Sequence, residues 1–483
     1  MERKEFLVIY NQGPDATFAL FQQLEQAAIS LTVHVRELTA RVQELEDRLA
    51  KDSHNSSKPP SSDGYSRKPQ SLRGKSGKMS GGQPGHRGTT LRMVEDPDQV
   101  VVHCAAACSR CGSSLCDVPG EVVARRQVLE LPDPSLVTIE HDIVCKVCPA
   151  CRTKNVGDFP AEVSQPVQYG PRFKAMGVYL QVYQLLPFER TRQLMANLFG
   201  GSLSEGTLYN WLSTCHDRLA DVDAATRKAV TAARVAHFDE TGLRIANNLR
   251  WLHTASTPTL TSYAHHDKRG KQALDDIGVL PGFTGTAVHD GFSTYFGYDG
   301  CKHALCNAHL LRELIFVKEQ PQQPWAAGMI DLLLSVKQEV DEAMPRGQTQ
   351  LPPDRLHDFE ARYAALLNDG FRDNPPPPRS GKRGRTKQSP ARNLLLRMER
   401  HRSSVLAFTN DFDVPFDNNL AERDLRMAKV RQKVSGCFRS NEGAAMFCRI
   451  RGYISTLRKQ DVHVLTSLQS VFEGSPYLPA LST

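Results

Sequence analysis

The sequence predicts a multidomain α/β protein in which a large sheet-containing core follows several smaller N-terminal modules. Its length is the first observation behind this, since 483 residues exceed what a single hydrophobic core usually supports. The second is a pair of apolar, strand-like runs, residues 235–242 and 286–291, that each bring an Asp close to a Gly. The third is the succession of strand-like and helix-like segments around these two runs.

The composition is typical of a soluble protein, with 40% hydrophobic and 23% charged residues. No apolar run approaches the ~18 residues that a membrane-spanning helix needs. The apolar stretch near the N-terminus is too short for a signal peptide. We therefore expect a cytoplasmic protein. Seven of the twelve cysteines crowd between Cys104 and Cys151, and such clustering in a cytoplasmic chain indicates metal binding.

Residues 1–52 are expected to contain a long helix. Leucines recur at intervals of seven, and a second apolar series fills the alternate positions of the same seam. This pattern predicts a parallel coiled coil, most simply a homodimer. The alternative is an amphipathic helix that packs on the globule of its own chain. The two series are Leu24, Leu31, Leu38 and Leu45, and Ala28, Val35, Val42 and Leu49.

Residues 53–92 form a linker rich in Ser, Gly, Pro, Lys and Arg that cannot bury enough apolar surface to fold. It holds eight basic residues and one acidic residue, so its charge alone equals the net +7 of the whole chain. A flexible basic arm of this kind suits a phosphate backbone. A solvated linker without a partner is the alternative.

Residues 93–165 are predicted to be a zinc-binding module. Two Cys-x-x-Cys turns, separated by strand-like runs such as 135–144, can supply four thiolates to a closed structural site. Cys145 also forms a Cys-x-x-Cys pair with Cys148, and Cys104 and Cys116 lie nearby, so the ligand set is ambiguous. We favour Cys108, Cys111, Cys148 and Cys151, because Pro149 fits a tight turn and Cys145 continues an apolar strand.

Helical sequence occupies residues 166–233. Residues 189–199 and 204–212 read as two helices joined by a Gly-containing turn, with Ser204 as the cap of the second. This is the helix-turn-helix pattern of many DNA-binding proteins. Any two short helices joined by Gly look similar, but the basic arm and the zinc module favour DNA binding.

Residues 234–440 are predicted to form the catalytic core. Strands are expected at 249–255, 260–265 and 301–305, and a short helix at 271–278. With the two Asp-bearing runs this gives three strands, a helix and two more strands, closed by a helix that carries an acid. That order is the order of the ribonuclease H-like nucleotidyl-transferase fold.

A largely helical insertion is expected at about 315–410 within this core. Its loop at 379–392 carries six basic side chains and no acid, so Lys382, Arg383 and Arg385 are candidate DNA clamps, although a solvated loop is the alternative. Residues 441–483 are predicted to be a C-terminal helical segment.

Three carboxylates are candidates for an acidic metal site. Asp239 and Asp290 are predicted at strand ends, and Glu422 in the first turns of a helix capped by Asp417 or Asn418. Carboxylates placed in this way suit a hard cation such as Mg²⁺. An Asp before a Gly can instead be a turn former. Glu313, which follows Asp290 more closely, is the rival third acid.

The helix of Glu422 also carries basic side chains. Arg426 and Lys429 lie four and seven residues beyond Glu422, on the same face, and are candidate phosphate contacts.

The sequence resembles the bacterial transposases of the insertion-sequence-66 family over nearly its whole length. The matching motifs are SerSerLysProProSerSerAsp and GlyGlyGlnProGlyHisArgGly in the linker, the paired cysteine turns, AspGluThrGly, AspAsnAsnLeuAlaGluArgAspLeuArg and LysValSerGlyCysPheArgSer. The resemblance implies cut-and-join transposition at terminal inverted repeats by an Asp-Asp-Glu triad, which falls on Asp239, Asp290 and Glu422.

The triad, the cysteine turns, the leucine seam and the resemblance together lead us to expect particular cofactors and partners. These are two Mg²⁺ ions (or Mn²⁺) at the triad, structural Zn²⁺, and double-stranded DNA as element ends and as target. A homo-oligomer on the nucleoid, with accessory proteins of the same element, is further expected. The alternatives are a catalytically silent DNA-binding regulator and a ribonuclease H-like nuclease that cuts without joining.

Overall fold

The computed structural model describes residues 2–56, 58, 63, 81, 85, 90–131, 134–160, 162–320, 322–377 and 388–482. Most of the linker and the basic loop residues Lys382, Arg383 and Arg385 therefore lie outside the described residues. None of the described helices is both long and apolar enough to cross a membrane.

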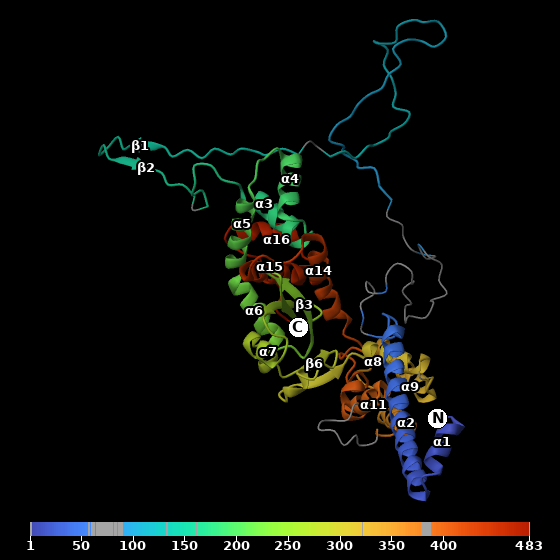
Figure 1. Ribbon diagram of the computed structural model, residues 1–483. Coiled ribbons are helices and arrows are strands. Elements are labelled where there is room, and N and C mark those ends of the chain that lie inside the picture. Colours follow the sequence, from blue (N-terminus) through green and yellow to red (C-terminus); the bar gives the residue numbers. More distant parts are fainter. Residues whose placement is uncertain are drawn as a thin grey trace.

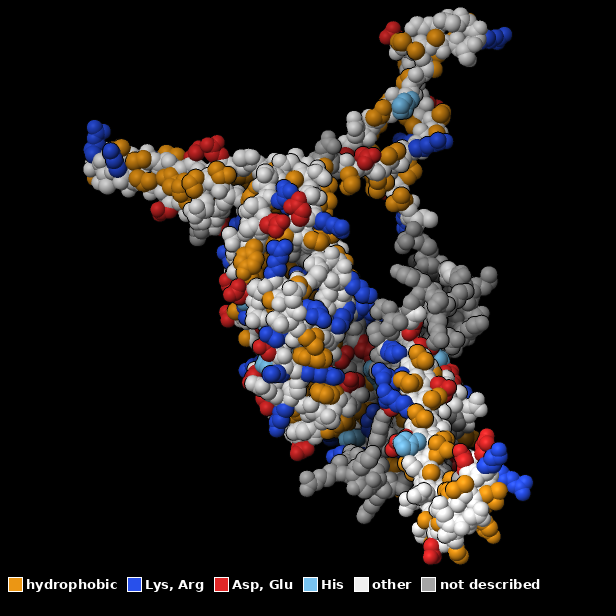
Figure 2. Space-filling view, in the orientation of Figure 1, with side chains coloured by type: hydrophobic (Ala, Val, Ile, Leu, Met, Phe, Trp, Pro, Cys, Tyr) orange, Lys and Arg blue, Asp and Glu red, His pale blue; other side chains and the backbone are white. Residues whose placement is uncertain are grey.

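The predicted N-terminal helix is present as α2 (Pro14–Ala50), preceded by the short α1 (Arg3–Tyr10). The leucine seam is exposed: Leu31 and Leu38 each keep 66% of their surface accessible. The end of α2 meets the globule, where Ala50 packs against an apolar cluster and the ammonium of the next residue, Lys51, lies over the Phe316 ring. Figure 2 shows the hydrophobic side chains along this helix.

The cysteine-rich region contains one small antiparallel pair, β1 (Cys145–Val147) and β2 (Lys154–Val156). The predicted strand at 135–144 is wrong, since these residues, all of them described, form no strand. A strand requires a neighbour for its backbone groups. Here the ladder begins only at Cys145, which pairs with Val156.

A five-stranded sheet forms the centre of the molecule (Figure 1). Its order is β5-β4-β3-β6-β7, with β4 antiparallel to both neighbours and with β3, β6 and β7 mutually parallel. All five predicted strands are confirmed. They are β3 (Val235–Ile245), β4 (Asn248–Ser256), β5 (Thr261–His266), β6 (Thr286–His289) and β7 (Lys302–Leu305).

The expectation that Asp239 ends its strand is wrong, because β3 continues to Ile245. Thr241 and Gly242 pair with Leu252 and Trp251 of β4, so a single Gly does not interrupt the ladder. The strand turns only at Ala246 and Asn247, whose positive φ angles of 46° and 65° suit a two-residue hairpin. The long β3–β4 hairpin leaves Asp239 in mid-strand.

Helices before the sheet occupy the region predicted to be helical. They are α3 (Pro171–Val178), the π-helical turn η2 (Tyr179–Tyr183), α4 (Phe188–Phe199), α5 (Glu205–Arg218) and α6 (Ala220–Thr231). The helix predicted between the third and fourth strands is confirmed as α7 (Lys271–Ile277). Short 3-10 turns are η3 (Leu280–Gly282), η4 (Tyr295–Gly297) and η5 (Met344–Arg346).

Helices also follow β7 and fill the insertion and the C-terminus. They are α8 (Asn307–Glu319), α9 (Pro324–Ala343), α10 (Pro353–Asp373), α11 (Pro390–Arg400), α12 (Arg402–Val405), α13 (Ala407–Asn410), α14 (Asn419–Ser435), α15 (Asn441–Lys459) and α16 (Val464–Phe472).

Two large apolar cores organise these elements. The first joins α3–α5, the sheet strands β3–β5 and the helices α14–α16 (Figure 1). It therefore contains residues from all three segments 166–233, 234–440 and 441–483. The second core lies within α8–α13. After the helices of the second core, the chain continues into α14, which carries Glu422 and packs in the first core beside the sheet.

Candidate functional site

Asp239 and Asp290 occupy equivalent positions on neighbouring parallel strands. The parallel pairing of β3 with β6 ends at His237 and Val288, and each Asp comes two positions later. Burial raises the pKa of the Asp239 carboxyl well above its ordinary value, and the charges of Glu240, Asp290 and Glu422 raise it further. Asp290 and Glu422 therefore lie close enough for their charges to act on Asp239, although the carboxylate oxygens of the three acids do not all fall within 4.8 Å of one another.

Glu240, the residue after Asp239, is a buried carboxylate that the sequence analysis missed. Its side chain is 1% exposed, accepts a hydrogen bond from the Tyr295 hydroxyl and forms a 2.7 Å ion pair with Arg269. The Arg269 guanidinium in turn covers the Phe292 ring. Because β3 alternates sides, Glu240 fixes the strand from the face opposite Asp239. An acid directly after Asp239 was visible in the sequence, but its partners are distant.

Glu422 lies in the first turn of α14, and the start of this helix is fastened to β3. The predicted side-chain cap by Asn418 is absent. Instead, the Asn418 amide accepts a hydrogen bond from His237 and donates one to the Phe238 carbonyl, at 2.8 and 2.9 Å. Asp417 accepts the Asn419 backbone N–H at 3.0 Å. The residues before Glu422 thus position the helix start beside Asp239.

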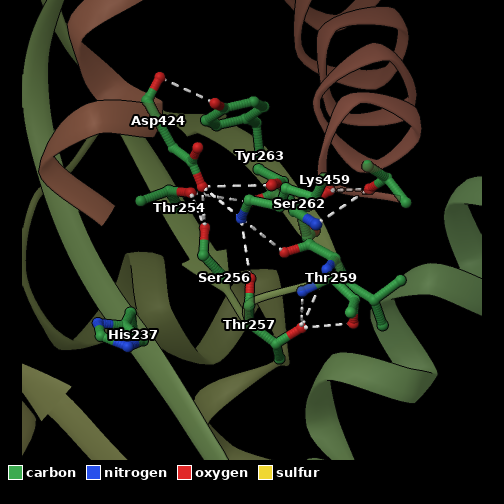
Figure 3. Close-up of polar contacts among 12 residues, drawn as sticks. His237, Thr254, Ser256, Thr257, Thr259, Ser262, Tyr263, Asp424 and Lys459 are labelled. Atoms are coloured by element: carbon green, nitrogen blue, oxygen red, sulfur yellow. Dashed lines mark hydrogen bonds and ion pairs between the residues drawn. The ribbon is translucent and has the colours of Figure 1, made fainter. Parts of the chain in front are cut away.

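A buried polar network holds the beginning of α14 against β4, β5 and α15. Figure 3 shows Asp424 facing Ser256 and Lys459, with Tyr263 beside them. The Asp424 carboxylate accepts hydrogen bonds from Ser256 at 2.6 Å and from Lys459 at 2.8 Å, and its carbonyl accepts one from Tyr263 at 2.9 Å. Asp424 is two residues from Glu422, so this network restrains the same helical turn.

Glu313, the rival third acid, is engaged elsewhere. It accepts a 2.6 Å hydrogen bond from Arg397 of α11. Its charge is not among the principal causes that raise the pKa of Asp239, whereas that of Glu422 is. Of the two glutamates, Glu422 is therefore the one whose charge acts on Asp239.

The basic residues of α14 have different environments. Arg426 is exposed, as the phosphate-contact prediction requires. Lys429 donates a 2.7 Å hydrogen bond to the Gly242 carbonyl of β3, so its ammonium already helps to hold the helix on the sheet.

Comparison with known families gives two matches. The model of the family "Transposase IS66 family" matches residues 166–446, which include the sheet, the insertion and α14. Residues 15–92 match a family of unknown function (DUF6444). No curated protein matches the chain significantly. The first match covers more than half of the chain.

The chain belongs to the IS66 transposase family. Membership gives the chain a transposase function in general, with DNA as the implied partner.

The cysteine turns of this IS66-family chain lie between the two matched segments. Both turns have the same backbone hydrogen bonds: Gly112 N–H bonds to the Cys108 carbonyl at 2.9 Å, and Arg152 N–H to the Cys148 carbonyl at 2.8 Å. A side-chain hydrogen bond with the hydroxyl of Ser113 is the largest cause that lowers the thiol pKa of Cys111 to about 7, and one with the hydroxyl of Thr153 does the same at Cys151.

The structure does not bring the two cysteine turns together. Among the described residues, their sulfur atoms do not form a group of three or more within 4.8 Å of one another. The two turns therefore have the same backbone structure, while the structure does not bring the four predicted ligands together.

The predicted helix-turn-helix elements are present as α4 and α5. Gly200 ends α4 in the left-handed region at φ 70°, and Ser204 caps α5 by accepting the Thr207 N–H at 3.0 Å. The inner face of α5 is buried through Leu208 and Trp211. The exposed positions of α5 are the ones available to a partner.

Proposed function

We propose that the chain is a metal-dependent DNA transposase with a ribonuclease H-like core. In this proposal Asp239, Asp290 and Glu422 hold two Mg²⁺ or Mn²⁺ ions at the scissile phosphate. The observation that carries it is the matching register of Asp239 and Asp290, each two positions beyond the paired His237 and Val288, with Glu422 in the first turn of α14. Burial and the charges of three other carboxylates raise the pKa of Asp239, which agrees with this arrangement. The strand order β5-β4-β3-β6-β7, with β4 alone reversed, supports the fold assignment.

The residues present fit a hard divalent cation. Carboxylate oxygens are the ligands that Mg²⁺ prefers. Glu422 Oε1 is buried and has no hydrogen-bond partner among the described residues, so this oxygen is available to a cation. Bound cations would activate the attacking water or 3′-hydroxyl and neutralise charge on the leaving oxygen.

The chain itself supplies positioning. Tyr295 and Arg269 hold Glu240, and with it the segment of β3 that carries Asp239. Asn418 and Asp424 fix the helical turn of Glu422. With each carboxylate on a restrained element, little reorganisation is needed when the phosphate arrives.

DNA contacts are proposed outside the acidic site. Arg426 on the exposed face of α14 and the basic loop with Lys382, Arg383 and Arg385 would bind phosphates, and Lys429 would contribute mainly by holding α14. The α4–α5 pair would dock on the element ends. These contacts determine affinity and its salt dependence more than the chemistry.

The cysteine module is proposed to bind structural Zn²⁺ through Cys108, Cys111, Cys148 and Cys151. Thiolates are soft ligands of the type that Zn²⁺ prefers, and the lowered thiol pKa of Cys111 and Cys151 favours the thiolate form.

The exposed seam of α2 is proposed to join two chains, because two element ends must be held together for joining.

The test uses a linear DNA that carries the element ends and a plasmid target. The chain with Mg²⁺ should cut at the ends and join them to the plasmid, and Asp239→Asn should bind the ends without cutting them. Cleavage without joined product would favour the nuclease alternative. End binding by the wild type with neither reaction would favour the silent regulator, and cleavage that persists after chelation would reject the acidic site.

A further inference from the structure

A second cluster of metal-ligand atoms lies beside the acidic site. The ligand atoms of Cys306, His309 and Glu422 all lie within 4.8 Å of one another. Cys306 follows β7 directly, and His309 lies in the first turn of α8, so the sulfur and the imidazole come from one short segment. Within the described part of the chain, no other group of three such ligands comes this close.

Two atoms of this cluster lack the hydrogen bonds that buried polar atoms normally make. His309 Nδ1 and Glu422 Oε1 are buried and have no partner among the described residues. They face each other at 3.8 Å, which is too long for a hydrogen bond. Two ligands of a tetrahedral zinc ion, each at about 2.1 Å from it, lie roughly 3.4 Å apart. A cation would need to draw these atoms together by only about 0.4 Å.

The sulfur of Cys306 is also prepared for a ligand role. Its residue is 1% exposed, and the backbone N–H of Asn418 donates to Sγ at 3.1 Å. Hydrogen bonds of this kind from outside the ligand shell orient metal ligands and stabilise charge on them. A cation that binds Sγ as a thiolate would displace the thiol proton to solvent.

We propose that Cys306, His309 and Glu422 form a binding site for one thiophilic divalent cation, such as Zn²⁺, adjacent to the acidic site. A thiolate, an imidazole and a carboxylate are three ligands that zinc accepts, and three protein ligands leave its fourth position open. Mg²⁺ disfavours sulfur, so the two sites select different ions. Glu422 belongs to both ligand sets, which couples the occupancy of one site to the geometry of the other.

The experiment counts bound ions on the full-length chain without DNA and without Mg²⁺. The protein is stripped of metal, loaded with Zn²⁺ or with Co²⁺ as a spectroscopic substitute, and freed of excess ion. The variants Cys306→Ala and His309→Ala should each bind one ion fewer per chain than the wild type and lose the corresponding thiolate-to-cobalt absorption. His309→Ala leaves the buried thiol in place, so it tests the site even if Cys306→Ala folds poorly.

The matched control is Cys448→Ala, which removes a buried cysteine on α15 and should leave the ion count unchanged. Equal counts in the wild type and both ligand variants, or an equal loss in Cys448→Ala, would overturn the proposal. Asp239→Asn should keep the ion although it abolishes cleavage. Failure of this site is therefore distinguishable from failure of the proposed catalytic function.

Discussion

Buried ionisable side chains around the sheet illustrate how burial and neighbouring charges set the pKa of single residues. The Asp239 carboxyl has a raised pKa because burial and like charges oppose its ionisation. His253 on β4 shows the opposite direction, because burial lowers the pKa of its imidazole to about 4. Both groups favour their neutral form, and only Asp239 has other carboxylates around it that a cation can bridge. Charge clustering, and not burial alone, therefore distinguishes the candidate catalytic residue.

The lowered pKa of His253 predicts a loss of stability in acid. The unfolded chain binds this proton near pH 6.5 and the folded chain only near pH 4. Stability contributed by the neutral imidazole is therefore present above about pH 6.5 and falls as the pH drops toward 4, by at most about 3 kcal/mol. His253→Leu should reduce this fall, measured as urea unfolding at pH 7 and pH 4.5. The exposed His357→Gln should not, and an unchanged fall in His253→Leu would contradict the account.

At the scale of elements, the position of α14 is held by contacts with β3 at its start and with β4, β5 and α15 through Asp424. The contact with β3 is made by Asn418, just before the helix. Burial lowers the pKa of Lys459, and the Asp424 carboxylate opposes that shift. The ion pair thus keeps a charged lysine inside the structure and restrains the turn that carries Glu422.

Removal of Asp424 should therefore destabilise the protein strongly. Asp424→Ala leaves Lys459 buried without its carboxylate, which typically costs roughly 3–5 kcal/mol. Arg423→Ala, at an exposed position of the same helix, should change stability by less than about 0.5 kcal/mol. Denaturant unfolding of both variants measures the difference. Similar small losses in the two variants would show that the network does not hold α14.

The cysteine turns form a second element with a testable requirement. If they share a structural Zn²⁺, Cys108→Ser with Cys111→Ser should lower the zinc content by one ion per chain and weaken binding to element ends. Cys104→Ser, outside the two turns, is the matched control. Unchanged zinc content in the double variant would refute this ligand assignment.

Over the whole molecule, the helices and strands were more predictable from the sequence than their pairing and tertiary contacts. Apolar patterning located all five strands. The helix of Glu422 was predicted from a cap at Asp417 or Asn418; the helix is present, but the Asn418 side chain does not cap it. The extent of β3 was missed, since its pairing with β4 overrides the local effect of Gly242. Cys306 and His309 lie close together in the sequence, but Glu422 follows them by more than a hundred residues. Their proximity depends on the tertiary fold and could not be predicted from local sequence.

The leucine seam of α2 makes a prediction about assembly. It is exposed along the single chain, and the proposed pairing of two chains would bury it. Leu31→Ala with Leu38→Ala should shift the chain toward the monomer in sedimentation equilibrium. Ser30→Ala with Glu37→Ala changes adjacent positions outside the seam and should leave association intact. Equal dimer affinity in both double variants would place the main interface elsewhere.

The central claim is that Glu422, and not Glu313, completes an acidic site with Asp239 and Asp290. Glu313→Gln breaks only a partly exposed ion pair with Arg397, worth about 0–1 kcal/mol, so the variant should remain folded. The most direct measurement is Mg²⁺-dependent cleavage of DNA carrying the element ends by Glu422→Gln and by Glu313→Gln. The account predicts that Glu422→Gln binds these ends without cutting them and that Glu313→Gln still cuts. Cleavage by Glu422→Gln and none by Glu313→Gln would contradict it.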